Sequence, residues 1–493
     1  MAEYILGIDI GTSACKTAVF DKSGNVTATK TGAYKVYYPQ EGFVEQDPLE
    51  WWAVVCDTVK FMIEESRINP DDIKAVGIDG QSWSAIMIDK YGDLIFDNPI
   101  WMDTRAAEIC EEIKRSIGEK AIFDVCGNPF SPTYTLPKLM WFKRYYPEVY
   151  KKAYKVLQSN SYIVYKLTGQ ISQDLSQCYG FHFFDMQKSE LNTEMAKEMG
   201  IDINLIPNIS ACHDIVGRIT REAAEFTGLL EGTPVVAGGL DAACGTLGAA
   251  VINEGQTQEQ GGQSGGMGIC LETYKAHPKL IMSNHVVPNR WLLQGGTVGG
   301  GGSFKWLKEN FFANTSFAEM DTLAASTPCG ADGLIFLPYM AGERSPIWDV
   351  KAKGVFYGMD YSKNRSHFIR AVMEGVAYSL QHNIKTAEES GCFIDMMHSI
   401  GGSANSDIWM QIKADVTNTP ISVTSSDTSA TLGAAILAGV AVGIYTDFHD
   451  AVKNTVSIKK TYTPNQKNHE AYMRCYGKYL EIYGNLKYTM QQT

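Results

Sequence analysis

The sequence predicts an α/β protein made of two domains. Its 493 residues exceed the length that one hydrophobic core usually serves. With 45% hydrophobic and 20% charged residues, the composition is ordinary for a globular chain. In both halves, short apolar runs bounded by turn residues alternate with stretches of helical periodicity. This alternation gives way to a glycine-rich stretch after residue 239, so we place the two domains at residues 1–248 and 249–493.

The first half opens with three predicted antiparallel strands. Residues 5–10 and 15–20 are apolar runs joined by a short glycine turn, and a polar turn then leads into a third strand. A helix is predicted over 48–66, where tryptophan and aliphatic residues recur at helical spacing. Further strands are expected at 75–79, 85–89 and 234–239.

The second half shows the same alternation. Strands are predicted at 334–338 and 397–401, and helices at 366–388 and 406–416. The uncharged stretch 428–446 is nearly long enough to cross a bilayer, but it is rich in Gly, Ala and Thr and has no basic flank or aromatic belt. It therefore predicts a buried helix of small residues, and we expect no membrane partner.

Charge and cysteine usage exclude several classes of function. A formal net charge of -12 disfavours a nucleic acid or an anionic membrane as partner. The 11 cysteines are scattered without a CxxC pair, which predicts buried thiols and no disulfide framework or zinc site. The first residues lack the basic start and the cleavage site of a secretory signal, so we expect a cytoplasmic protein. An anionic ligand would need positive charge and backbone amides concentrated locally.

The turn after the first strand has the chemistry of a nucleotide site. Asp9 ends a buried strand, where a carboxylate can hold Mg²⁺ through water. Gly11 lets backbone amides approach a phosphate, and Lys16 can neutralise its charge. The alternative is a simple hairpin whose aspartate accepts hydrogen bonds from local amides. For this short motif alone, both interpretations stay open.

Three further glycine-rich turns lie at residues 260–266, 299–303 and 400–406. Each offers amides for part of ATP, and the last leads into a helix whose N-terminus suits an anion. Taken singly, each turn is explained better by a bend or by close packing of two elements. The sequence contains neither the P-loop nor the Rossmann signature, so a nucleotide site needs another architecture.

Asp241 is the candidate catalytic base. It follows the strand at 234–239 and precedes a small-residue segment that suits the start of a helix. One positioned carboxylate suffices for phosphoryl transfer, because the reaction otherwise needs only alignment and charge neutralisation. Taken alone, an aspartate at such a place is more often a helix N-cap.

Together these motifs resemble the FGGY family of carbohydrate kinases, and its xylulokinase members most of all. The likeness runs from one end of the chain to the other. The matching segments are residues 7–13, 45–48 with 51–52, 101–105, 137–139 with 141, 238–241, 337–346, 401–402 and 432–435. The block 337–346, which reads Leu-Pro-Tyr-Met-Ala-Gly-Glu-Arg-Ser-Pro, is especially specific.

The resemblance implies both a fold and a set of roles. The fold is the actin, hexokinase and Hsp70 superfold, with two ribonuclease H-like domains whose cleft closes over sugar and ATP and excludes water. Asp241 is then the general base, and Asp9 lies near Mg²⁺. The phosphates are expected at Gly11, Thr12, Ser13, Gly262, Gln263 and Ser264, with Lys16 as a weaker candidate, and the adenosine at Gly301, Gly402 and Ser406. The sugar or polyol is expected at Gln81, Ser82, Trp83, Trp101, Asp103, Thr133 and Asp241.

Several positions depart from the xylulokinase pattern. Ser82 and Trp83 stand where that pattern has Met-His, and Ala242 stands where Asn is expected. A tryptophan can wall one face of a sugar but cannot hydrogen-bond in the two ways open to histidine. We therefore expect a changed set of recognised hydroxyls and a best substrate other than D-xylulose, although ordinary core packing of Trp83 is equally open. Gln263 replaces the usual Thr of the phosphate turn, and its amide can still donate to a phosphate.

Alternative functions stay open at this point. Kinases of glycerol, ribulose, gluconate or deoxy-ketoses share the phosphate machinery and differ in the pocket of the first domain. A non-catalytic relative would bind sugar or nucleotide as a sensor, but the presence of both Asp9 and Asp241 argues against it. The oligomeric state is open between a monomer and a homodimer.

Overall fold

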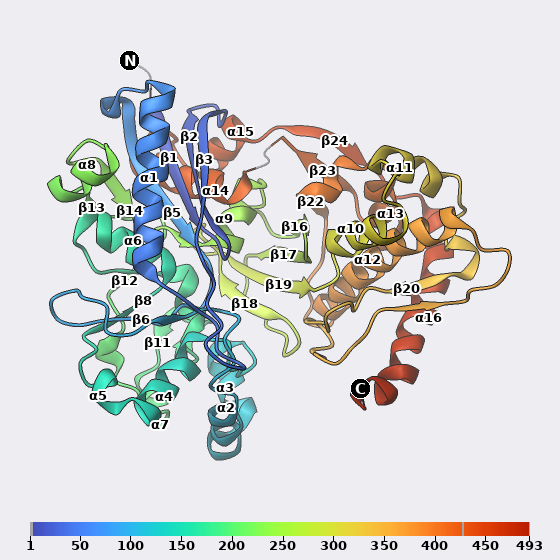
Figure 1. Cartoon of the computed structure of the whole chain (residues 1–493), viewed down its shortest axis with the longest axis horizontal. Helices are drawn as coiled ribbons and strands as arrows, with labels where there is room; N and C mark the ends of the chain where they lie inside the picture. Colours follow the sequence, from blue (N-terminus) through green and yellow to red (C-terminus); the bar gives the residue numbers. More distant parts are fainter. Residues whose placement is uncertain (1–2, 426–427, 493) are drawn as a thin grey trace.

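Two large mixed sheets organise the molecule, one in each lobe (Figure 1). The computed structural model describes residues 3–425 and 428–492. The N-terminal sheet contains β1 (Tyr4–Ile10), β2 (Ala14–Asp21), β3 (Val26–Ala33), β5 (Ile73–Gly80), β13 (Ile215–Arg218), β14 (Pro234–Val236) and β15 (Gly239–Leu240). The C-terminal sheet contains β16 (Gln256–Gly261), β17 (Gly265–Leu271), β18 (Ile281–Asn284), β19 (Trp291–Thr297), β22 (Met396–Ile400), β23 (Ile421–Thr424) and β24 (Ile458–Tyr462).

The strand orders of the two sheets correspond. The N-terminal sheet runs β3-β2-β1-β5-β14-β13, and the C-terminal sheet runs β19-β17-β16-β22-β23-β24 with β18 added beyond β19. In the N-terminal sheet β3, β2 and β1 are antiparallel neighbours, β5 and β14 run parallel to β1, and β13 is antiparallel to β14. In the C-terminal sheet β19, β17 and β16 are antiparallel neighbours, β22 and β23 run parallel to β16, and β24 is antiparallel to β23. This is the ribonuclease H-like topology in two copies, as the sequence predicts.

Helices cover both sheets. In the N-terminal lobe they are α1 (Pro48–Ser66), α2 (Ala107–Ile113), α3 (Glu119–Cys126), α4 (Thr135–Tyr145), α5 (Pro147–Tyr150), α6 (Ser159–Thr168), α7 (Thr193–Glu198), α8 (Arg221–Thr227) and α9 (Asp241–Gly248). Along the rest of the chain they are α10 (Gly301–Phe311), α11 (Phe317–Ala325), α12 (Arg365–Glu388), α13 (Asp407–Thr417), α14 (Ser429–Ala441), α15 (Phe448–Thr455) and α16 (Gln466–Gln491). The predicted helices at 48–66, 366–388 and 406–416 are confirmed as α1, α12 and α13 to within a residue at each end.

Helix α14 crosses from the C-terminal half onto the N-terminal sheet, where Figure 1 shows it beside the blue strands. Gly7 of β1 and Gly77 of β5 are neighbours in the sheet. A Cβ on Gly7 would come within 2.1 Å of the Thr431 carbonyl oxygen, and one on Gly77 within 1.9 Å of that of Ala434. Only glycine therefore allows the helix backbone to lie this close to the strands. The predicted buried helix of small residues is confirmed, and its small residues serve contact between the lobes.

Helix α9 makes the reciprocal contact. It packs against α14 and against β17 of the C-terminal sheet, and its Thr246 hydroxyl donates to Gln258 Oε1 at 2.9 Å. The strand predicted at 234–239 is interrupted before this helix, because Gly238 takes a positive φ of 74° and splits it into β14 and β15. The chain therefore reaches Asp241 from the two-residue strand β15, which follows this break and pairs with β5.

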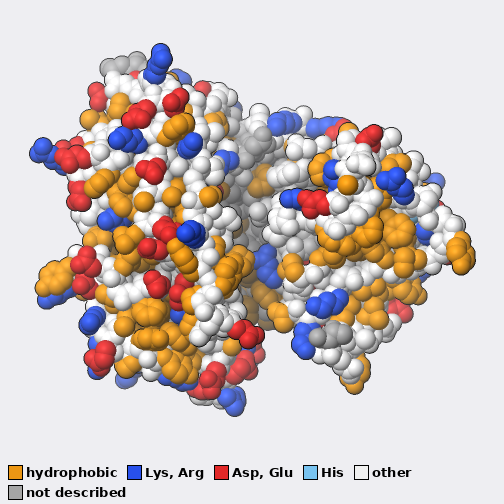
Figure 2. Space-filling view, viewed as in Figure 1, with side chains coloured by type: hydrophobic (Ala, Val, Ile, Leu, Met, Phe, Trp, Pro, Cys, Tyr) orange, Lys and Arg blue, Asp and Glu red, His pale blue; other side chains and the backbone are white. Residues whose placement is uncertain are grey.

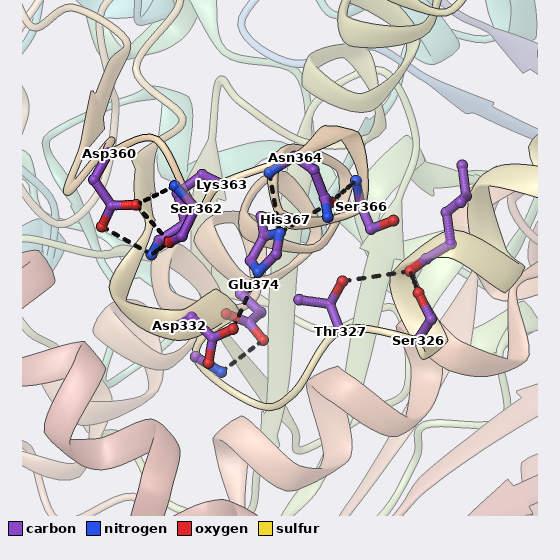
Figure 3. Close-up of polar contacts among 12 residues, drawn as sticks. Ser326, Thr327, Asp332, Asp360, Ser362, Lys363, Asn364, Ser366, His367 and Glu374 are labelled. Atoms are coloured by element: carbon purple, nitrogen blue, oxygen red, sulfur yellow. Dashed lines mark hydrogen bonds and ion pairs between the residues drawn. The ribbon is translucent and has the colours of Figure 1, made fainter.

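The long helix α12 has a side-chain cap at its exposed N-terminus (Figure 3). Asn364 accepts a hydrogen bond from the Ser366 amide at 3.0 Å, and His367 Nε2 lies 3.1 Å from an Asp332 carboxylate oxygen. Such caps satisfy amides that have no partner inside the helix. The described residues include no helix long and apolar enough to span a membrane. The cysteines form no disulfide, and 9 of the 11 are buried, as predicted.

Candidate active site

A cavity of about 350 Å³ lies between the two lobes, where Figure 2 shows a furrow in the surface. Its N-terminal wall comes from the ends of β1, β5 and β15, where Thr12, Gln81 and Asp241 reach the cavity. Its opposite wall includes Ser264, from the turn after β16, and the β19 segment. Ligands of such folds bind where strand ends from two elements meet, so this cavity is the candidate reaction centre.

Asp241 stands at the edge of this cavity as the first residue of α9. Its Oδ1 accepts a hydrogen bond from the Ala242 amide at 2.6 Å, whereas the N-cap position belongs to Leu240. Burial raises the pKa of Asp241 to about 7, and the charge of Asp9 contributes to this rise. A carboxylate with such a pKa, facing a cavity, has the properties of a general base near neutral pH.

Asp9 lies on β1 directly opposite Asp79 of β5. Burial raises the pKa of Asp9 to about 6, against the lowering effects of a hydrogen bond with Asp79 and of the charge of Lys16 on the neighbouring strand. Asp79 is fully buried, and burial together with the charges of Asp9 and Asp241 raises its pKa well above the ordinary value. The site thus holds three acids at its base, of which sequence reasoning missed Asp79. The signal was available, since Asp79 ends a predicted buried strand as Asp9 does.

The sugar-binding candidates at the end of β5 are held by a chain of hydrogen bonds. Gln81 Nε2 donates to Gln46 Oε1 at 2.7 Å, and Gln46 Nε2 donates to the Thr12 carbonyl at 2.8 Å. None of the described residues donates to Gln81 Oε1, a buried oxygen of a residue that lines the cavity. Trp101 Nε1 donates to Thr12 Oγ1 at 2.9 Å, which ties the predicted sugar wall to the predicted phosphate turn.

Trp83 belongs both to the cavity wall and to an aromatic cluster. Its ring stacks on Tyr134 with centroids 4.0 Å apart and meets Tyr179 edge-on at 5.6 Å. The residue is only 9% exposed, yet it lines the cavity next to Ser82, whose hydroxyl accepts from Tyr179 at 3.1 Å. The two interpretations of Trp83 from the sequence therefore do not exclude each other. The backbone at Trp83 has a positive φ of 59°, which is uncommon for a residue other than glycine.

Two predicted sugar residues lie outside this cavity lining. Asp103 is fully buried; its Oδ2 accepts from Arg105 Nη2 at 2.8 Å and from the Val44 amide at 2.7 Å, and its Oδ1 accepts from Arg105 Nε at 2.9 Å. Both of its oxygens are thus taken up by its own neighbourhood, which makes it a support of the wall. Thr133 is half-buried, and its hydroxyl lies 3.3 Å from that of Ser131. The sequence could not show these partners, because a motif gives the type of each residue but not where its side chain points.

A second cavity, of about 540 Å³, lies in the C-terminal lobe. The predicted nucleotide residues that line it together are Gly262, Gln263, Gly301, Gly402 and Ser406. Aromatic rings that sequence reasoning missed form another wall, where Phe304 stacks near Phe317 at 5.9 Å and lies 5.0 Å from Trp409. Small residues on one side and aromatic faces on the other suit a planar base with a phosphate tail.

The glycine turns of this lobe hold one another. The amide of Gly301 donates to the Gly262 carbonyl at 2.8 Å, and that of Gly302 to the Gln263 carbonyl at 2.9 Å. A Cβ on Gly300 would come within 2.3 Å of the Ser264 carbonyl carbon, so close packing explains this glycine. Ser406 caps α13 by accepting the Trp409 amide at 3.2 Å.

The remaining predicted phosphate residues divide between the cavities. Ser264 and Thr12 line the interlobe cavity from opposite sides, so the two hairpin turns face each other across it. Gly11 and Ser13 complete the N-terminal turn without lining either cavity, and the Gly11 amide donates to the Ala14 carbonyl at 3.2 Å. Lys16 stands next to Asp9 across the β1–β2 ladder, where its charge acts on that carboxylate.

Comparison with known proteins agrees with this arrangement. The N-terminal domain of the FGGY family of carbohydrate kinases matches residues 4–248, and its C-terminal domain matches residues 261–442. Xylulose kinases of Staphylococcus epidermidis and Bacillus subtilis are 33% and 31% identical, over 98% of this chain and 97% of each relative. Crystal structures of a ligand-bound xylulose kinase and of a gluconate kinase, both from Lactobacillus acidophilus, have TM-scores of 0.93 and 0.92 at 26% identity, covering 99% of this chain and 99% and 98% of theirs. The chain therefore belongs to the FGGY family of carbohydrate kinases and is an ATP-dependent sugar kinase.

Proposed function

We propose that this kinase phosphorylates a hydroxyl of a small ketose or polyol, in a reaction of the xylulose kinase type. One observation carries the proposal: Asp241 lines the cavity between the Gln81 wall and the Ser264 turn. A sugar bound there would have its hydroxyl beside a carboxylate whose pKa is raised to about 7. The full-length relatives with xylulose kinase names support the same reaction type.

In the proposed reaction, Asp241 accepts the proton of the sugar hydroxyl as its oxygen attacks the terminal phosphorus of ATP. The turn at Gly262, Gln263 and Ser264 binds phosphate oxygens, and Gly301, Gly402 and Ser406 border the adenosine. We also propose that the division into a sugar domain and an ATP domain falls at residues 248 and 249. Because ATP is a cosubstrate of the cell interior, we place the reaction in the cytoplasm.

Asp9 is the proposed residue for Mg²⁺. No group of three or more His, Cys, Asp or Glu within 3–425 and 428–492 is spaced to hold a metal ion by protein ligands alone. Mg²⁺ in kinases is commonly held by one or two carboxylates together with water and substrate phosphates, so a half-buried Asp9 beside Asp79 fits it. When bound, the ion would neutralise charge on the phosphates.

The sugar specificity is proposed to differ from that of D-xylulose kinases. Trp83 gives the cavity an apolar face where histidine was expected, while Gln81 beside it contributes a polar side chain to the lining. An indole can pack against one face of a sugar, but it lacks the two ring nitrogens through which a histidine hydrogen-bonds to hydroxyls. Gluconate is the second candidate class, since a gluconate kinase structure and a gluconokinase of Bacillus licheniformis are among the similar proteins.

The test is a panel assay of ADP release with ketoses, polyols and gluconate. We expect ATP-dependent turnover with at least one ketose or polyol, and a specificity constant for D-xylulose below that of another sugar. A clear preference for D-xylulose would contradict the specificity proposal and leave the kinase reaction standing. Thermal stabilisation by a sugar without any ADP release would instead favour a binding protein.

A further inference from the structure

The segment after β20 (Ile335–Leu337) contains the sequence block that is especially specific, yet no role has been assigned to its charged residues. The structure shows how firmly this segment is held. Glu343, 4% exposed, accepts the amides of Val298 and Arg344, each at 2.7 Å. The Ser345 hydroxyl accepts the Gly296 amide at 2.6 Å and donates to the Gly296 carbonyl at 3.1 Å. The backbone on both sides of Arg344 is thereby fixed to the end of β19.

The Arg344 side chain lies flat against Gly296 and reaches the interlobe cavity. A Cβ on Gly296 would come within 2.8 Å of Nη2 and 3.0 Å of Cζ, so a larger residue there would displace the guanidinium. Among the described residues, none forms a hydrogen bond or an ion pair with this guanidinium, whereas the buried Arg105 and Lys413 each pair with a glutamate, at 2.6 and 2.5 Å. The hydrogen bond of Arg344 to Glu343 is made by its backbone amide. A half-buried arginine with its donors available is positioned to receive an anion.

The cavity lining carries two charged side chains among the described residues. Asp241 comes from the N-terminal lobe and Arg344 from the C-terminal lobe. Ser264 and Gly265, at the end of the turn that belongs to the nucleotide pocket, line the same cavity. Gly296, on which the Arg344 guanidinium lies, pairs with Gly266 in the β17–β19 ladder, directly after that turn. A chain of net charge -12 needs a local cation where phosphate charge is transferred, and Arg344 supplies one.

We propose that Arg344 binds the oxygens of the phosphoryl group as it passes from ATP to the sugar hydroxyl, an assignment that rests on the proposed function. The hydroxyl oxygen forms the new bond to phosphorus, the bond to the oxygen of ADP breaks and ADP leaves with that electron pair. The hydroxyl proton goes to Asp241, and Arg344 keeps its protons throughout. A guanidinium fits this role because it binds two oxyanion oxygens at once in a fixed plane.

The carboxylate of a sugar acid is the competing ligand for the same guanidinium. The position of Arg344 favours the phosphoryl group, because Arg344 lies on the C-terminal wall with Ser264 and not on the Gln81 wall where we place the sugar. The two ligands differ in what they would do to the kinetics. If Arg344 binds the phosphoryl group, its removal lowers kcat for every sugar. If it binds a carboxylate, its removal raises KM for a sugar acid alone.

The experiment compares R344M, R344K and R344A with the wild-type enzyme on its best ketose or polyol and on gluconate. For R344M we expect kcat to fall about 100- to 1000-fold, with KM for the sugar and for ATP changed less than about threefold. R344K should recover only part of the loss, because an ammonium cannot bind two oxygens in one plane. Free guanidinium ion should raise the rate of R344A, which a merely structural arginine would not allow.

The control is R365M, which removes an exposed arginine near the N-terminus of α12, next to the Asn364 cap of Figure 3. Its kcat should equal that of the wild type. Unchanged kcat in R344M, or a defect confined to KM for gluconate, would overturn the proposal. Should R344M fail to fold, the drop in kcat of R344K decides in the same way. Absence of turnover in the wild type on every sugar would refute the proposed function itself, which separates the two failures.

Discussion

The two lobes share one strand order but differ in the charge at the ends of their strands. In the N-terminal sheet, β1 and β2 are joined by the three residues Gly11, Thr12 and Ser13. In the C-terminal sheet, β16 and β17 are joined by Gly262, Gln263 and Ser264, again three residues. The strand before each turn also has a parallel neighbour, β5 beside β1 and β22 beside β16. The two turns therefore occupy equivalent places. The structure thus supports the duplication that these short turns suggest.

The residues before the turns show how the copies have diverged. Asp9 of the N-terminal lobe corresponds to Gln260 of the C-terminal lobe, and Asp79 corresponds to Ile400 in the paired strand. The acid Glu259, one residue earlier, is buried and neutralised by Lys413 at 2.5 Å. At these paired strand ends the N-terminal lobe therefore carries acids and the C-terminal lobe carries uncharged residues. A metal and a base need the first surface, and ATP phosphates need the second.

The largest expected effect comes from removing the base of the acidic lobe. Asp241→Asn should lower kcat by about 10²- to 10⁴-fold, because the sugar hydroxyl loses its proton acceptor. Dissociation constants for ATP and sugar, measured by calorimetry, should stay near those of the wild type. Asp124→Asn on the exposed face of α3 serves as the matched control and should leave kcat unchanged. Near-normal turnover of Asp241→Asn would contradict the assignment of the base.

A smaller effect is expected from giving the neutral lobe the charge of its partner. Gln260 lies before the phosphate turn and lines the interlobe cavity, so Gln260→Glu places a carboxylate where Asp9 stands in the other lobe. Repulsion of the phosphates should raise KM for ATP about tenfold, which corresponds to about 1.4 kcal/mol. Gln260→Met, which has similar length and no charge, separates repulsion from loss of the amide. Equal KM values in both variants would show that charge is not what distinguishes the two lobes.

A third prediction concerns the stability of the acidic lobe and its pH dependence. Burial raises the pKa of Asp79 well above its ordinary value, so the folded chain holds a proton that the unfolded chain releases above a pKa of about 3.9. The free energy of unfolding should therefore fall as pH rises from about 4 through the folded pKa, by at most about 1.4 kcal/mol per pH unit. Asp79→Asn cannot ionise, so urea unfolding should show it to be more stable than wild type at pH 8. The difference should vanish toward pH 4, and a difference that grew on acidification would have the wrong sign.

Local features of the fold could be predicted because local sequence determines them. The first hairpin, α1 and α12 follow from apolar periodicity and turn residues, and their observed bounds agree closely. The place of α14 on the N-terminal sheet could not be predicted, since its contacts with Gly7 and Gly77 join segments more than 350 residues apart. The sequence pattern predicts that α14 is buried, but it does not show that the N-terminal sheet is what covers it.

The candidate site divides in the same way. Asp241, Gln81 and Gly262 lie in the predicted cavities, because motif and strand end coincide there. Asp103 lies apart, because its neighbour Arg105 claims both oxygens. The place of Arg344 in the cavity is known only from the structure, since the fold brings the loop after β20 against Gly296 of β19.

The glycine pair under α14 has a consequence for how the protein can be dissected. A helix made of residues 429–441 completes the floor of the N-terminal lobe, so an expressed fragment of residues 1–248 would leave the Gly7 and Gly77 groove open to water. In the intact chain α14 packs on the N-terminal sheet, and α9 packs on β17 of the C-terminal sheet. Separately produced halves should thus associate or aggregate instead of behaving as independent modules.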